Sequence, residues 1–186
     1  AISLLLVIIV GPMTISAKSA KSSTYATEQI QAFFLAQEGL ELAQKARDDF
    51  RLKYISDVTA GVSSPDDPWG EFTDISVSGA YKNCFNLSGC GLEWNTTNDA
   101  LVAPVLCSGT NCLLYKNGTA NKRSGFTHVV AVGNTVTPFT RKIYFTTVAG
   151  NEGREVMVRS EVTWRTGSIV ADQKVQLDTY LFNITY

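Results

Sequence analysis

Four cysteines are the residues with the clearest capacity for chemistry. Cys84, Cys90, Cys107 and Cys112 all fall in one region rich in Gly, Asn and Ser. The gaps of five and four intervening residues differ from the two-residue pairs of zinc ribbons, and no histidine lies nearby. An even number of cysteines favours two disulfides over a zinc site, and three pairings remain open.

Residues suited to catalysis are few. His128 is the only histidine, and its neighbours Thr127 and Val129 favour a structural or surface position in a strand over a general base. Glu38 and Glu41 share a helix flank that the charge pattern predicts to face solvent. No nucleophile elbow or glycine-rich phosphate loop occurs, so we expect neither an enzyme nor a cofactor site.

Three aspartates could suggest calcium, because hard cations prefer clustered carboxylates. Asp66, Asp67 and Asp74 lack the spacing of an EF-hand, and Pro65 and Pro68 indicate a turn that solvent reaches. We therefore predict no metal site.

Four asparagines match the Asn-x-Ser/Thr pattern of N-glycosylation, which marks exposed loops in secreted eukaryotic proteins. In a bacterial protein the same pattern is mostly a chance match. The candidate sites are Asn86, Asn95, Asn117 and Asn183.

Composition narrows the classes of function. The chain has 186 residues, 45% of them hydrophobic, which is enough for one domain with a core plus an appendage. With 16 basic and 17 acidic residues the net charge is -1, and nucleic-acid binders usually carry a basic surplus. No specific nucleic-acid partner is predicted.

The first residues form an unusual apolar segment. Residues 1–17 contain no charge, close to the roughly 20 residues of a membrane-spanning helix. Gly11 and Pro12 interrupt this segment and predict a kink, because Pro12 cannot donate to the carbonyl of Ile8. Lys18 and Lys21 suit a membrane boundary. A cleaved signal peptide is the alternative, but the basic region that opens one is missing.

A long amphipathic helix is predicted next, over residues 25–55. Its apolar positions recur at steps of three and four residues, and the apolar stripe is wider than one sheet contact requires. A second apolar surface would need a second partner. The stripe comprises Ile30, Phe33, Ala36 or Gln37, Leu40, Ala43, Arg47, Phe50 and Tyr54, broadened by Phe34, Leu35 and Leu42.

The remainder divides into two regions. Residues 56–125 are predicted to be loop-rich and pinned by disulfides, with one or two short strands. Residues 126–186 are predicted to form an antiparallel sheet with strands at 126–132, 141–148, 155–165 and about 175–181. The fold class is therefore α+β, with a long N-terminal helix covering the dry face of a C-terminal sheet.

Taken together, these features resemble the bacterial type IV pilins and pseudopilins. The closest stretches are residues 30–42, with the run Ala32-Phe33-Phe34-Leu35-Ala36-Gln37-Glu38-Gly39-Leu40-Glu41, and residues 158–164. The family's processed N-terminus normally begins with an aromatic residue or Met and carries a glutamate at its fifth position, and neither is present here. The resemblance implies that roughly two helical turns precede Ala1.

The resemblance also implies a mechanism. Residues 1–24 would be a membrane and filament-core helix, and residues 25–186 the globular head. The subunit would wait in the inner membrane, and the pilus assembly machinery would then add it to a homopolymer of its own copies on the cell surface, with adhesion or motility as roles. The implied polymerisation residues are Leu4, Leu5, Leu6, Val7, Ile8, Ile9, Val10, Gly11, Pro12 and Ile15.

Two other functions fit the same pattern. One is a minor pseudopilin of a secretion or DNA-uptake system. The other is a single-pass anchored domain whose disulfide loops bind a ligand on the cell surface. A tether of that kind would need neither a second apolar face on the helix nor a hinge.

Overall fold

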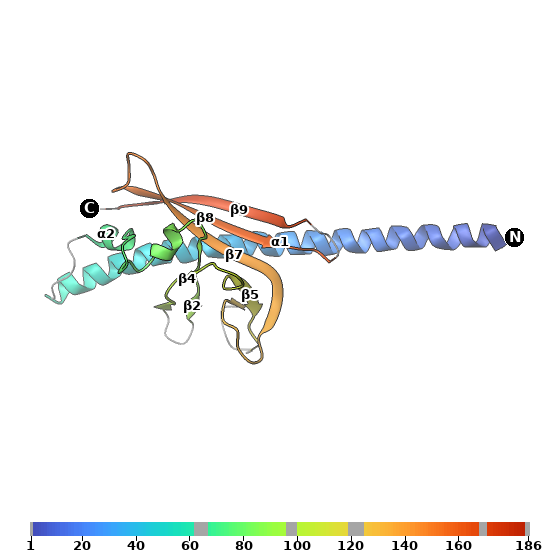
Figure 1. Ribbon diagram of the computed structural model, residues 1–186, viewed down its shortest axis with the longest axis horizontal. Helices are drawn as coiled ribbons and strands as arrows, with labels where there is room; N and C mark the ends of the chain where they lie inside the picture. Colours follow the sequence, from blue (N-terminus) through green and yellow to red (C-terminus); the bar gives the residue numbers. More distant parts are fainter. Residues whose placement is uncertain (1, 62–66, 96–99, 119–124, 168–170, 185–186) are drawn as a thin grey trace.

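The computed structural model describes residues 2–61, 67–95, 100–118, 125–167 and 171–184, with the side chains of residues 2–14 and 17 outside that description. The fold is α+β, as predicted: one long helix, α1 (Ile2–Thr59), lies along an antiparallel sheet. Figure 1 shows the first part of α1 projecting beyond the rest of the molecule, with the head gathered around the remainder of the helix.

Helix α1 is continuous. It passes through Gly11 and Pro12 without interruption, and Figure 1 shows no bend there, so the predicted kink is wrong. A proline removes one backbone hydrogen bond, and here the flanking turns keep the helical path. The helix also ends later than predicted, at Thr59, and Ala60 and Gly61 close it by donating to Ser56 O and Val58 O.

Three long strands form a meander that carries most of the sheet. Their bounds are β7 (Thr135–Thr147), β8 (Glu155–Trp164) and β9 (Gln173–Phe182). Strand β8 pairs with β7 on one side and β9 on the other. Every second residue of β8 from Val156 to Trp164 is buried, which confirms the predicted alternation.

The region between α1 and β7 contains several short elements. They are α2 (Pro68–Phe72), the 3-10 helix η1 (Lys82–Phe85), β1 (Cys90–Gly91), β2 (Trp94–Asn95), β3 (Ala100–Leu101), β4 (Val105–Leu106), β5 (Leu113–Lys116) and β6 (Phe126–Thr127). Both β1 and β5 pair with β7, so the main sheet has seven strands, while β2 and β3 form a separate pair. This region is richer in strands than predicted.

One predicted strand is much shorter than expected. Within 126–132 only Phe126–Thr127 pairs, as β6, and Val129, Val130 and Val132 are exposed in the segment that follows. The Val-rich composition favoured a strand, but β-propensity acts through neighbouring strands, and none pairs with residues 128–132 here.

Two disulfides are present, as predicted. They join Cys84 to Cys90 and Cys107 to Cys112, so each cysteine pairs with its neighbour in sequence. The first bridge joins η1 to β1, and the second closes the loop between β4 and β5. The first therefore ties η1 to the main sheet, which contains β1.

The core has two parts on the same side of the sheet. One is aromatic: Phe72, Tyr81 and Phe85 surround Phe145 at ring-centroid distances of 5.4, 6.1 and 5.5 Å. The other joins Ala32, Leu35 and Ala36 of α1 to residues of β5, β7 and β8 that include Trp164. Helix α1 contributes to both parts, so packing of the head requires its second half.

An ion pair between a buried arginine and a partly exposed glutamate locks α1 to the sheet. Arg141 of β7 is 2% exposed, and its Nη1 lies 2.8 Å from Glu38 Oε2. The same guanidinium donates to Leu35 O of α1 at 3.3 Å and to Leu92 O after β1 at 3.1 Å. Three segments far apart in sequence therefore meet at one side chain.

Gly39 allows α1 to approach the sheet at this point. A Cβ at residue 39 would lie 2.3 Å from Ser160 Oγ and 3.3 Å from Arg141 Cδ. We expect Gly39→Ala to lower the free energy of unfolding by about 1–3 kcal/mol, because the packed core must shift. Urea unfolding followed by tryptophan fluorescence measures this change.

Gly153→Ala is the matched control, since a Cβ there meets nothing within 4 Å. Adding Ser160→Gly to Gly39→Ala should recover part of the loss. Equal stability of the Gly39→Ala and Gly153→Ala variants would contradict the close approach.

Candidate assembly surface

The side of α1 opposite the sheet carries large apolar residues in contact with solvent. Near the start of the head lie Ile30, Phe33 and Phe34, here called the N-terminal patch, with exposed fractions of 58%, 46% and 62%. Near the end of α1 lie Leu52, Ile55 and Val58, the C-terminal patch, with exposed fractions of 64%, 53% and 56%. Spacings of three and four residues place each set on one helix face.

Polar residues separate the two patches on the same face. They are Gln37, Glu41, Gln44 and Asp48, and all four are exposed. Gln37 Nε2 donates to Glu41 Oε1 at 3.2 Å, and Asp48 pairs with Arg47 at 2.7 Å. The outward face of α1 is therefore apolar, then polar and acidic, then apolar again.

The face turned to the sheet is built from small residues. Ala32, Ala36, Ala43 and Ala46 are fully buried there, together with Leu35 and Leu42. The wide stripe predicted for this helix contains residues of both sides: Ala36 and Ala43 are buried here, whereas Ile30 and Phe33 face outward. Close packing of the helix on the sheet selected alanine and glycine at the buried positions.

The predicted polymerisation residues lie almost entirely outside the described side chains. This applies to Leu4, Leu5, Leu6, Val7, Ile8, Ile9, Val10, Gly11 and Pro12. Ile15 is described and is 70% exposed. Within the described part of the chain, no helix combines the length and apolarity that crossing a membrane requires.

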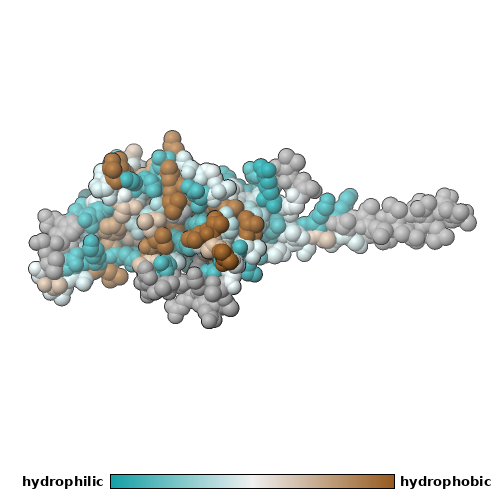
Figure 2. Space-filling model, turned by 60° about the horizontal axis from the view of Figure 1, so that its bottom comes forward, coloured by the Kyte–Doolittle hydropathy of each residue, from teal (hydrophilic) through white to brown (hydrophobic). Residues whose placement is uncertain are grey.

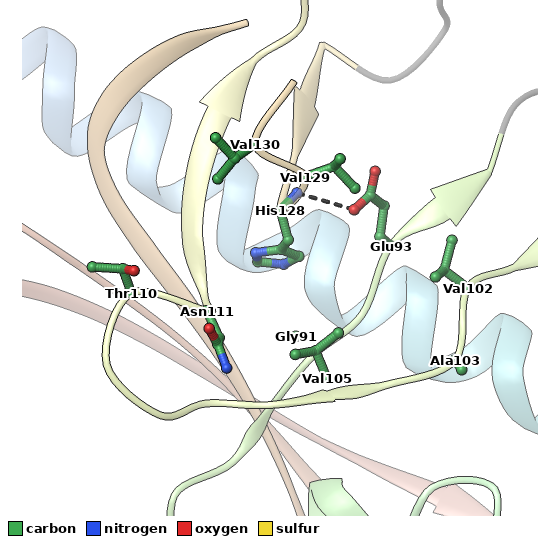
Figure 3. Close-up of a pocket in the computed structure, with 10 residues that line it drawn as sticks. All are labelled: Gly91, Glu93, Val102, Ala103, Val105, Thr110, Asn111, His128, Val129 and Val130. Carbon is green, nitrogen blue, oxygen red and sulfur yellow. Dashed lines mark hydrogen bonds between the residues drawn. The ribbon is translucent and has the colours of Figure 1, made fainter. Parts of the chain in front are cut away.

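A second feature of the head is a pocket of about 220 Å³ beside β1. Figure 3 shows the His128 ring and the Glu93 side chain among mostly apolar residues. The lining residues are Gly91, Glu93, Val102, Ala103, Val105, Thr110, Asn111, His128, Val129 and Val130. Figure 2 shows that apolar side chains also gather on the outer surface of the head.

Hydrogen bonds hold the two titratable groups of this pocket in structural roles. Glu93 accepts from Thr127 Oγ1 and, at 3.0 Å, from the backbone N–H of His128. His128 Nδ1 lies 3.3 Å from Leu113 O, so a neutral ring with its proton on Nδ1 donates to that carbonyl. Burial, followed by the charge of Arg141, lowers the pKa of His128 to about 4. The neutral ring therefore fastens the segment after β6 to β5.

The other predicted sites lie apart from one another. Asn86 is exposed after η1, where its Oδ1 accepts from Ser88 N, and Asn183 donates to Gly153 O after β9. Asn95 lies in β2 and Asn117 directly after β5. No group of three or more metal-ligating side chains occurs among the described residues.

Sequence reasoning missed the Arg141–Glu38 pair and the Glu93 anchor. The burial of Arg141 could have been predicted. Phe139, Ile143 and Phe145 alternate with the same period as Arg141 on one face of the strand, and all three are buried. Glu93 carried no such signal, since its partners Thr127 and His128 are distant in sequence.

Compared with family models, with curated proteins and with solved structures, the chain gives no match.

Proposed function

We propose that this chain is a structural subunit of an extracellular filament resembling a type IV pilus, which polymerises through α1 after a membrane-anchored stage. The observation that carries the proposal is the two-sided character of α1. One face packs on the sheet through alanines, and the opposite face exposes six large apolar residues in two patches. Exposed apolar patches of this kind mark interaction surfaces.

The position of the projecting part of α1 supports the same function. Figure 1 shows the first part of α1 projecting beyond the sheet, where copies of the same helix can reach it. Tyr25 lies where the head begins, because its ring centroid is 6.4 Å from that of Trp164. Its sequence is apolar up to Ile15, apart from a few small or polar residues. Such a helix can leave lipid for a bundle of like helices at little hydrophobic cost, because both surroundings are apolar.

The two disulfides support an exported head. Each closes a short loop, and bridges of this kind persist in oxidising compartments outside the cytosol. A head whose cysteines are all paired in disulfides is consistent with a role outside the cell.

An anchored binding domain is the competing class of function. Such a domain would use α1 only as a tether, and a tether gains nothing from exposed Phe33, Phe34 and Ile55 within the head. A filament subunit uses that face for contacts with other copies, so the outward patches favour assembly.

Phe34→Asp tests the proposal. Phe34 is 62% exposed, so the head should fold, whereas filaments should be lost because a charge in a packed helix contact costs several kcal/mol. Electron microscopy of sheared surface material, with the intact mass of the subunit, measures assembly, and circular dichroism reports folding.

Leu87→Asp is the matched control, since Leu87 is 99% exposed and lies beside Tyr144 and Arg159, on the face of the sheet away from α1. It should leave filaments intact. Normal filaments from Phe34→Asp, or no filaments from the unsubstituted chain, would refute the proposed function.

A further inference from the structure

A cleft of about 360 Å³ lies on the face of the sheet away from α1, between the turn at residues 86–89 and the outer sides of β7 and β8. Gly89 N closes the turn by donating to Asn86 O at 2.9 Å. A Cβ at residue 89 would lie 2.8 Å from Tyr144 Cε1, so the turn rests on the Tyr144 ring. The lining includes Asn86, Leu87, Tyr144, Met157, Arg159 and Glu161.

The charged groups of the cleft are already paired. Arg159 donates from Nε and Nη2 to the two carboxylate oxygens of Asp178, at 3.0 and 3.2 Å. Glu161 Oε2 lies 3.2 Å from Lys174 Nζ. Among the described residues that line the cleft, each charge therefore has its counter-ion, and the cleft offers no surplus charge that would attract an ionic ligand.

Polar atoms nevertheless remain for a neutral ligand. The Arg159 guanidinium has more N–H donors than the two that bind its partner, and Glu161 has a second carboxylate oxygen. Asn86 Oδ1 accepts from the backbone two residues later, which leaves its amide nitrogen as a donor. Burial, followed by the charge of Glu161, raises the pKa of the Tyr144 hydroxyl, so this group keeps its proton and can donate as well as accept.

Apolar surface lies directly beside these polar atoms. It comes from the ring of Tyr144, from Met157, and from Leu87 on the turn. A purely apolar ligand would remove the two ion pairs from water without replacing their hydration, which is unfavourable. A sugar ring instead combines hydroxyls around its edge with an apolar C–H face, and the negative face of an aromatic ring attracts the partial positive charge of C–H bonds.

We propose that this cleft binds a neutral saccharide. The C–H face of one sugar ring lies against Tyr144, and its hydroxyls exchange hydrogen bonds with Arg159 and Glu161. The volume falls within the range of about 300–1,000 Å³ that is typical of ligand sites. All the lining residues belong to one head, so the inference goes beyond the proposed function and does not depend on polymerisation.

Saturation-transfer difference NMR tests the proposal with the full chain in a detergent that has no sugar head group. The neutral probes are lactose, maltotriose and chitotriose, and a heparin-derived tetrasaccharide is the anionic probe. We expect saturation transfer to at least one neutral probe, persisting at raised ionic strength, and none to the anionic probe. Absence of transfer to all three neutral probes, or transfer to the anionic probe alone, would overturn the proposal.

Two positions test the cleft itself, with affinity measured by titration of the neutral probe that binds. Tyr144→Ala should lower the affinity about tenfold because the ring contact is lost, whereas Tyr144→Phe should retain most of it. Leu87→Asp should also weaken binding, and because Leu87 is 99% exposed, the head should remain folded. Circular dichroism reports folding of each variant.

Phe182→Ala is the matched control. Phe182 is 52% exposed on the same face of the sheet, where it pairs with Glu155, and it lies outside the cleft lining. Its substitution should leave binding unchanged, and a loss equal to that of Tyr144→Ala would contradict the proposed site. A chain that binds no saccharide yet forms filaments would contradict only this inference, whereas one that binds saccharide without forming filaments would contradict only the proposed function.

Discussion

Replacing Glu38 by Leu is expected to lower the free energy of unfolding by about 3–5 kcal/mol. The substitution leaves the Arg141 guanidinium, which is 2% exposed, without its carboxylate partner. The remaining contacts of that side chain are the carbonyls of Leu35 and Leu92, which carry only partial charge. A buried cation without a compensating anion accounts for most of the expected loss.

Two further variants separate the ion pair from the other contacts. Glu38→Gln should cost less, because an amide oxygen can still accept from Arg141 Nη1. Glu38→Leu combined with Arg141→Met should recover much of the loss, since an apolar pair of similar volume often replaces a buried ion pair without penalty. Urea unfolding followed by tryptophan fluorescence gives each free energy.

Glu41→Leu is the control on the same helix. Glu41 is exposed, and its substitution should change the free energy of unfolding by no more than about 0.5 kcal/mol. If Glu38→Leu proved as mild as Glu41→Leu, the buried pair would not lock α1 to the sheet.

The second large effect concerns pH and His128. Its folded pKa of about 4 lies below the ordinary value of 6.5, so the unfolded chain binds the proton more tightly than the folded chain. Stability from this group is therefore complete above about pH 6.5 and falls as the pH drops toward about 4. The difference in pKa corresponds to a loss on the order of 3 kcal/mol over that interval.

Unfolding curves recorded at several pH values measure this dependence. His128→Gln should remove the His128 contribution while its amide can still reach Leu113 O, so the two pH profiles should diverge between about pH 6.5 and about pH 4. The carboxylates contribute equally to the pH dependence of both proteins, so their contribution cancels when one profile is subtracted from the other. Parallel profiles would show that His128 does not carry the effect.

Sequence patterns predicted those parts of the fold that depend on local periodicity. The alternation in β8 is confirmed residue by residue, because Val156, Val158 and Val162 repeat with the period of a strand. The disulfides were also predicted, but their pairing depends on how β1 places Cys90 beside η1, which spacing does not reveal.

Predictions failed where contacts between residues distant in sequence determine the position of a side chain. Glu38 was assigned to a face in contact with solvent, and its partner Arg141 lies 103 residues away. The stripe predicted for α1 did not separate the side that meets the sheet from the outward side, and it left out Gly39 and Ala46, which lie against the sheet. Ile30 and Phe33 are exposed, so the second apolar surface that the wide stripe indicated lies on the outward side of α1.

The composition of β9 has a consequence for assembly at high subunit density. Among the described strands β9 pairs only with β8, so it forms an edge of the sheet, and an edge can template unwanted strand pairing. Its outer face carries Lys174 and Asp178, which form ion pairs with Glu161 and Arg159 of β8. Charged side chains disfavour edge-to-edge pairing. In the proposed filament these charges would disfavour pairing between the sheets of crowded heads, and α1 would be the element through which copies join.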